Sequence, residues 1–142
     1  LGFSYRHSAL PEGWGVVRAA LKVEPGNPKR LEEQLQEIYA LKAHAQPTQG
    51  RTGGSTFKNP LPEVSSYKAW ELIDQAGCRG LKRGAALVSE KHCNFLVNVG
   101  GATALDIELL GEEVRNRVFQ QTGVLLEWEI LRIGQSSEKE VI

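Results

Sequence analysis

The sequence predicts an α+β fold, because helical and strand patterns occur together in it without an internal repeat. Apolar residues recur at helical spacing between residues 28 and 44, and again beyond residue 103. Apolar runs typical of strands cover residues 94–99 and 124–133. At 142 residues, the chain is long enough for one sizeable core, or for one small domain and part of another.

The composition narrows the class of function. An apolar fraction of 41% and a charged fraction of 24% are ordinary for a globular protein. The 17 basic and 17 acidic residues cancel, so there is no broad electrostatic attraction to nucleic acid or to an anionic membrane. This balance still allows a local cluster of charge that holds an anionic small molecule. No apolar run approaches the roughly twenty residues that cross a bilayer, and no signal peptide is visible.

The cysteines and histidines do not predict a metal site. Cys78 and Cys93 form no C-x-x-C pair and are too few for a disulfide framework, so we expect reduced, structural thiols in a cytosolic protein. His7, His44 and His92 share no metal-ligand spacing. We interpret all three as structural or surface residues, with His92 also a candidate for contact with a substrate.

The first part of the chain predicts a strand followed by a helix. Residues 15–23 are apolar at alternate positions, which is typical of a half-buried strand. Asn27 is then suited to cap a helix, with Pro28 at the first helical position. This helix ends near residue 44, and its predicted apolar stripe consists of Leu31, Leu35, Ile38 and Leu41.

A long loop and a short helix are predicted next. From residue 46 to residue 62 the composition changes to proline, glycine, threonine and polar residues, which indicates a loop of unusual length. Loops of this kind are often functional. Ser66 is predicted to cap the following helix, and Gly77 to close it.

The remaining elements are two strands between residues 80 and 99, a helix and a last strand over residues 124–133. Thr103 and Asp106 have the spacing of a capping box, and the helix that they open is predicted to end at Gly123. We therefore divide the chain into a strand-plus-helix part (1–45), an α+β unit (46–134) and a loose polar tail (135–142).

The segment from Gly53 to Pro60 is the strongest local indication of chemistry. Its consecutive glycines allow positive φ and close backbone approach, so that successive amides can point at an anion. The order of a P-loop is absent. A flexible turn has the same composition, so spacing alone leaves both interpretations open. The polar groups available here come from Arg51, Ser55, Thr56, Lys58 and Asn59.

Glu129 is a second candidate. In a strand, its side chain shares one face with Leu125, Glu127 and Leu131. A carboxylate between apolar neighbours is partly desolvated, which favours its neutral form and suits acid–base or polarising work. The alternative is a pair of glutamates on the solvent face of an antiparallel sheet, which periodicity alone favours.

Tyr5 and Arg6 are a third candidate pair. An aromatic ring beside a guanidinium is suited to bidentate binding of a carboxylate. Most arginines in proteins are simply solvated, so this pair indicates a function only together with other segments.

Five segments occur in a recognisable order: Tyr5-Arg6-His7-Ser8, Gly54-Ser55-Thr56-Phe57-Lys58-Asn59-Pro60, residues 69–77, residues 88–98 and Leu126-Glu127-Trp128-Glu129-Ile130. In this order they resemble the UDP-N-acetylenolpyruvoylglucosamine reductase (MurB) family. The resemblance covers nearly the whole chain except the polar tail. It implies a C-terminal substrate-binding domain of α+β class, preceded in residues 1–45 by the last strand and a linking helix of an FAD-binding domain.

The resemblance implies an enzyme of peptidoglycan precursor synthesis in the bacterial cytoplasm, with FAD as cofactor and NADPH as reductant. The implied substrate is UDP-N-acetylglucosamine enolpyruvate. Its enol ether carbon accepts hydride from the reduced flavin, and a serine protonates the neighbouring carbon to give UDP-N-acetylmuramate. Most of the FAD-binding region is expected to lie outside this chain. The implied partner is therefore the N-terminal FAD-binding part of the same protein, and the chain alone is expected to be inactive.

Residue by residue, the resemblance assigns Ser55 as the proton donor, Arg6 as the group that binds the enolpyruvyl carboxylate and Glu129 as its acidic partner. Asn59 matches a substrate-binding position. Trp128 stands where the family usually has proline, and His7 where it usually has aspartate. The further candidates for substrate binding are Tyr5, Arg51, Lys58 and His92, and no metal is implied.

Two other classes of function stay open at this point. A non-catalytic module would bind a sugar nucleotide or a peptide through the loop from Arg51 to Asn59. A purely structural α+β domain would contain the same glycine-rich segment as a flexible connection.

Overall fold

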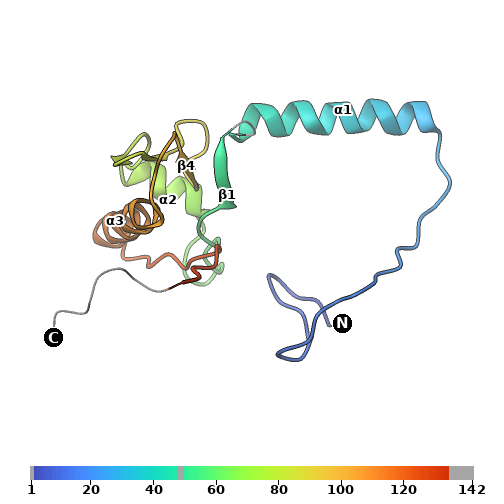
Figure 1. Cartoon of the computed structure of the whole chain (residues 1–142), viewed down its shortest axis with the longest axis horizontal. Coiled ribbons are helices and arrows are strands. Elements are labelled where there is room, and N and C mark those ends of the chain that lie inside the picture. Colours follow the sequence, from blue (N-terminus) through green and yellow to red (C-terminus); the bar gives the residue numbers. More distant parts are fainter. Residues whose placement is uncertain (1, 48–49, 135–142) are drawn as a thin grey trace. The chain divides into compact units, whose positions relative to one another are not determined.

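The computed structural model describes residues 2–47 and 50–134 of the chain (Figure 1). These fall into two compact units, Leu1–Leu35 and Gln36–Ile142, which are described separately. The tail predicted at residues 135–142 lies outside the described residues.

The predicted strand at residues 15–23 is wrong. These residues are irregular, and their apolar side chains, including Val17, Leu21 and Val23, are exposed. A strand needs a neighbouring strand to satisfy its N–H and C=O groups, and no described segment pairs with this one. Alternation therefore indicated which side chains would share a face, but not whether that face is covered.

Helix α1 (Pro28–Ala45) forms as predicted. The Asn27 side-chain oxygen accepts a hydrogen bond from the amide of Arg30 at 3.2 Å, and its carbonyl accepts one from Leu31 at 3.0 Å. No residue of α1 is buried, so its predicted apolar stripe is exposed. Among the described contacts, the hydrogen bonds of its cap are thus the main ones that stabilise this helix.

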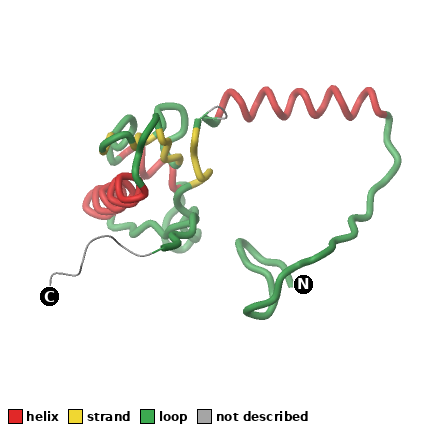
Figure 2. Tube along the Cα trace, in the orientation of Figure 1, coloured by secondary structure: helices red, strands yellow, loops and turns green. Residues whose placement is uncertain are grey.

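The second unit contains a four-stranded antiparallel sheet in the order β1-β4-β3-β2. Figure 2 shows the strands in yellow. The predicted loop over residues 46–62 is wrong in part, because five of its residues form the edge strand β1. Composition concealed this strand, since its pairing uses backbone groups alone. The strands are β1 (Arg51–Ser55), β2 (Lys82–Arg83), β3 (Ala86–Val88) and β4 (Phe95–Asn98).

Two helices complete the core of this unit. Helix α3 (Ala104–Thr122) contacts β2, β3, β4 and helix α2 (Ala69–Gln75). The apolar faces of these elements bury one another, and this burial is the main source of stability. The largest buried core side chains are Phe57, Leu72, Ile73, Val88, Leu110, Val114, Val118 and Leu126.

The helix ends follow the sequence signals to different degrees. The Thr103–Asp106 capping box is confirmed: each side chain accepts from the other residue's amide, at 3.0 and 2.9 Å. Gly123 ends α3 with a φ of +73°. The predicted cap of α2 at Ser66 is wrong, because Lys68 occupies the N-cap position. Glu71 accepts from the amide of Lys68, and Asn59 from that of Ala69.

The predicted last strand over residues 124–133 is also wrong. Trp128 forms only an isolated bridge with Phe57, and the rest of this segment is irregular. Flanking bonds run from Lys58 N to Glu127 O at 2.9 Å and from Glu129 N to Thr56 O at 2.8 Å. The pairing stops after Lys58, since Asn59 caps α2 and Pro60 has no N–H to donate.

Removing the Thr103 cap should destabilise the domain. We expect Thr103→Ala to lower the free energy of unfolding by about 1 kcal/mol, because the amide of Asp106 loses its acceptor. Ser66→Ala is the matched control and should cost less than about 0.5 kcal/mol, since this exposed residue caps nothing. Urea denaturation measures both, and equal losses would contradict the assignment of the caps.

Candidate functional site

Ser55 lies at the end of the edge strand β1, half-buried, where the pairing with β4 shifts register. Gly54 has a φ of +90°, which favours glycine, and a Cβ built there would meet no atom within 4 Å. The register shift bends the strand and re-aims the residues that follow it. The backbone beside the Ser55 hydroxyl is therefore open to a ligand.

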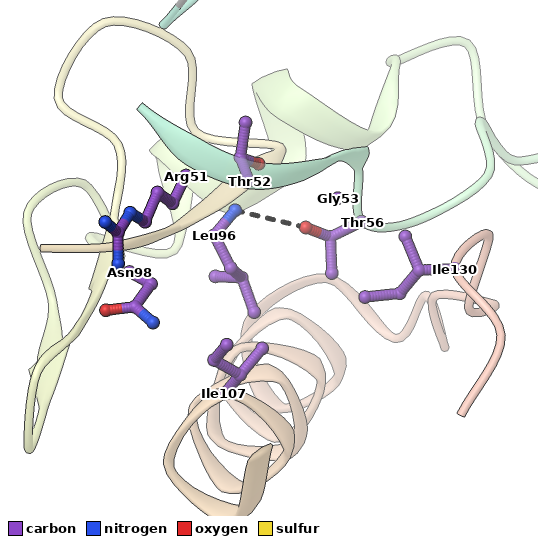
Figure 3. A pocket seen from close by; sticks show the side chains of 8 residues that line it. All are labelled: Arg51, Thr52, Gly53, Thr56, Leu96, Asn98, Ile107 and Ile130. Atoms are coloured by element: carbon purple, nitrogen blue, oxygen red, sulfur yellow. Dashed lines mark hydrogen bonds between the residues drawn. The ribbon is translucent and has the colours of Figure 1, made fainter. Parts of the chain in front are cut away.

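Thr56 fixes the position of Ser55 by bonding to two other segments. Its amide donates to Asn94 O at 2.8 Å, and its Oγ1 accepts from the amide of Leu96 at 3.2 Å (Figure 3). Its carbonyl accepts from the amide of Glu129 at 2.8 Å. Thr56 itself is 1% exposed. One buried residue thus joins the chain segments of both main catalytic candidates.

Asn94 is a positioning residue that the sequence reasoning missed. Its side chain, which is 4% exposed, accepts from Phe57 N at 2.9 Å and donates to Phe57 O at 2.8 Å. These two bonds mimic a rung of a sheet. The available signal was a primary amide within an otherwise apolar strand, because a buried amide must find partners.

Glu129 is half-buried, and its Oε2 atom is fully buried. The expectation that Leu125 and Leu131 flank it in an apolar layer is wrong, because these side chains are 58% and 88% exposed. The burial of the carboxylate thus comes from other parts of the domain. Its neighbour Glu127 is exposed and lies 3.3 Å from the ammonium of Lys58, an ion pair that water screens strongly.

A cavity of about 310 Å³ lies beside this segment. Figure 3 shows Leu96, Ile107 and Ile130 converging on it from β4, α3 and the C-terminal segment. Arg51, which is exposed, also lines the cavity and brings a guanidinium to these apolar walls. The remaining lining residues are Thr52, Gly53, Thr56 and Asn98.

Asn59 and His92 have structural contacts of their own. The side-chain oxygen of Asn59 caps α2 by accepting a hydrogen bond from the amide of Ala69 at 3.1 Å. The His92 ring packs edge-on against the Phe95 ring, with their centroids 4.8 Å apart. Its Nδ1 atom accepts a hydrogen bond from the amide of Asn94 at 3.3 Å. Burial, assisted by the charge of Arg79, lowers the pKa of His92 below its usual value.

Tyr5 and Arg6 belong to the N-terminal unit. The guanidinium carbon of Arg6 lies 5.2 Å from the centroid of the Tyr5 ring, in a cation–π contact, and Arg6 has a φ of +57°. Backbone bonds between Ser4 and His7 close a tight turn around this pair.

The cysteines are free and buried, as expected for structural thiols. Burial raises the pKa of Cys93 to about 11, so its nucleophilic thiolate form is scarce at neutral pH. The described part of the chain holds no cluster of three or more histidine, cysteine or acidic residues that could bind a metal ion. No helix within residues 2–47 and 50–134 is sufficiently long and apolar to cross a membrane.

The second unit combines an antiparallel sheet with helices, which is an α+β arrangement. Residues 46–133 match the family model for the C-terminal domain of UDP-N-acetylenolpyruvoylglucosamine reductase. The chain belongs to this family.

Individual relatives agree with this assignment. Curated proteins named UDP-N-acetylenolpyruvoylglucosamine reductase are 59% identical in Granulibacter bethesdensis and 55% identical in Gluconobacter oxydans. These matches cover 94% and 99% of this chain, but only 42% and 44% of the relatives. The crystal structure of the Thermus caldophilus MurB enzyme matches with a TM-score of 0.72 and 38% identity, over 91% of this chain and 45% of that one. The chain therefore spans less than half the length of these relatives.

His92 should make the free energy of unfolding depend on pH. The pKa of His92 is lower in the folded state than the value of about 6.5 in the unfolded state. The unfolded state therefore binds more protons below about pH 6.5, and stability should fall as the pH drops through this range.

Urea unfolding between pH 7.5 and pH 5 tests this expectation. His92→Gln should flatten the pH dependence, whereas the same change at the exposed His44 should leave it in place. An unchanged slope in His92→Gln would show that other groups carry the effect.

Proposed function

We propose that this chain is the C-terminal part of an NADPH- and FAD-dependent reductase that converts UDP-N-acetylglucosamine enolpyruvate to UDP-N-acetylmuramate. The observation that carries the proposal is the set of bonds around Thr56, which ties the Ser55 segment to the Glu129 segment. The names of the relatives support the substrate class. The role would be in peptidoglycan precursor synthesis in the bacterial cytoplasm, and thus in cell-wall biogenesis, cell shape and cell division.

The residues at the end of β1 fit a flavin as neighbour. Gly54 leaves open space where a side chain would stand, so a flat ring system can approach the backbone next to Ser55. When bound, FAD reduced by NADPH supplies the hydride that the enol ether accepts. In this proposal the N-terminal part of the protein, outside this chain, provides most of the flavin-binding residues.

Ser55 would donate the proton that completes the reduction. A serine hydroxyl is a weak acid, but a strongly basic carbanion beside it makes the transfer feasible. Position then matters more than acidity, because a proton moves only over a short, well-aligned distance. The buried bonds of Thr56 and Asn94 supply this fixed position.

Glu129 and Arg6 would control the charge that develops on the substrate. Hydride addition leaves negative charge delocalised into the carboxylate, and a guanidinium stabilises this charge as it forms. Glu129 would act as the acidic partner of Arg6 near this group, and its Oε2 atom is buried.

Several other residues would bind the anionic sugar nucleotide. Arg51 brings positive charge to β1, the strand that carries Ser55, and Lys58 follows this strand and forms an ion pair with Glu127. Asn59 would contribute the half of its amide that does not cap α2. Tyr5 would support Arg6 through their cation–π contact, and His92 would offer a further polar contact.

The proton-donor role predicts a selective defect in the intact protein. In Ser55→Ala, NADPH should still reduce the flavin, whereas reoxidation of the flavin by the UDP-sugar substrate should slow roughly 10²- to 10⁴-fold. Stopped-flow absorbance separates the two half-reactions. Ser66→Ala is the matched control, since this exposed serine is absent from the site. Reoxidation at the wild-type rate in Ser55→Ala would rule out Ser55 as the acid.

The cavity beside Arg51 favours one other function, a non-catalytic module that binds a sugar nucleotide. Titration of the chain with the UDP-sugar substrate, followed by the amide chemical shifts of Gly54 and Ser55, tests binding directly. Both hypotheses predict shifts. The module is supported if the intact protein binds the UDP-sugar substrate but does not turn it over, and a complete lack of shifts would contradict both.

A further inference from the structure

Trp128 packs directly on Gly111 in the middle of α3. A Cβ built on Gly111 would lie 2.0 Å from the indole Cη2 atom, so no other residue fits beneath the ring. Glycine is otherwise unfavourable in a helix interior, which indicates a packing reason for its presence. The indole Nε1 also donates to Glu112 Oε1 at 3.0 Å. The ring is thus fixed both in depth and in orientation.

Two arginines fasten the same segment to α3. The guanidinium carbon of Arg132 lies 4.9 Å from the centroid of the Trp128 ring, and the group forms ion pairs with Glu108 at 2.6 Å and Glu112 at 3.3 Å. Arg115 Nε donates to Leu126 O at 2.9 Å. The chain from residue 126 to residue 132 is therefore held at several points along one face of the helix.

This attachment reaches both catalytic candidates. Trp128 precedes Glu129, and neighbouring side chains in an extended bridge point to opposite sides, so the placement of the indole determines where the carboxylate points. The Trp128 ring also lies 4.9 Å from that of Phe57, which is 1% exposed and follows Ser55 by two positions. A shift of the indole would therefore move both segments.

We propose that Trp128, packed on Gly111 and bonded to Glu112, is a positioning residue that aligns Glu129 with Ser55 for proton transfer. This inference rests on the proposed function of those two residues. Trp128 acts through its neighbours and does not itself take part in the chemistry. If the indole only filled space in the core, its replacement would lower stability in proportion to the apolar volume removed and would leave turnover of the folded protein unchanged.

The test compares variants of the intact protein. Trp128→Phe keeps an aromatic ring but removes the N–H that bonds to Glu112. Gly111→Ala fills the space beneath the ring, although alanine favours the helix itself. We expect each to lower kcat for substrate-driven flavin reoxidation at least tenfold, with a smaller change in KM and with flavin reduction by NADPH intact. Val118→Ala, a buried change on the same helix, is the control for stability.

A second measurement does not depend on turnover. Hydrogen exchange of the Glu129 amide, which bonds to Thr56 O, should become faster in Trp128→Phe than in Val118→Ala at matched melting temperatures. Where Gly111→Ala does not fold, Trp128→Phe carries the test. A wild-type kcat in Trp128→Phe would overturn the inference. It would also be overturned if Val118→Ala lost as much kcat as Trp128→Phe and its Glu129 amide exchanged equally fast.

Glu129→Gln separates this inference from the function on which it rests. If this variant loses activity while Trp128→Phe and Gly111→Ala retain it, the positioning role is wrong and the proposed function stands. If Glu129→Gln has wild-type kcat and KM, the assignment of Glu129 fails and the positioning role fails with it.

Discussion

Thr56 joins three stretches of chain that are distant in the sequence, and the arrangement of the site depends on this connection. Its amide, carbonyl and hydroxyl bond to Asn94, Glu129 and Leu96, and water has almost no access to it. Each such bond contributes only about 1 kcal/mol net, but a buried group left without its partner costs more. The three bonds therefore favour one arrangement of β1, β4 and the C-terminal segment over neighbouring alternatives.

Structural and functional demands meet in single side chains of this domain. Asn59, which we propose to bind substrate, also caps α2, so the orientation of its amide is set before any substrate arrives. Asn94 uses both ends of its amide on the backbone of Phe57. Since such bonds are short and directional, they convert the rigidity of the core into a fixed position for nearby reactive groups.

The sequence predicted those elements that depend on local interactions. The caps at Asn27 and Thr103 act within one helical turn, and both helices form where these signals place them. Strands were harder, because a strand requires a partner that its own residues do not specify. The apolar alternation at residues 15–23 finds no partner among the described residues, while the polar, glycine-rich β1 pairs with β4.

For the site, the order of motifs indicated Ser55 and Glu129, but nothing in their spacing revealed that Thr56 bonds to both segments. The contact of Trp128 with Gly111 is similarly invisible in the sequence, since it joins a helix and an irregular segment through the shapes of their side chains. The register shift at Gly53 and Gly54 also affects the edge of the sheet. An edge strand exposes N–H and C=O groups with which another chain can pair, and a bend of this kind interrupts that row. The register shift beside Ser55 thus limits the length of regular strand that the edge of this sheet offers for such pairing.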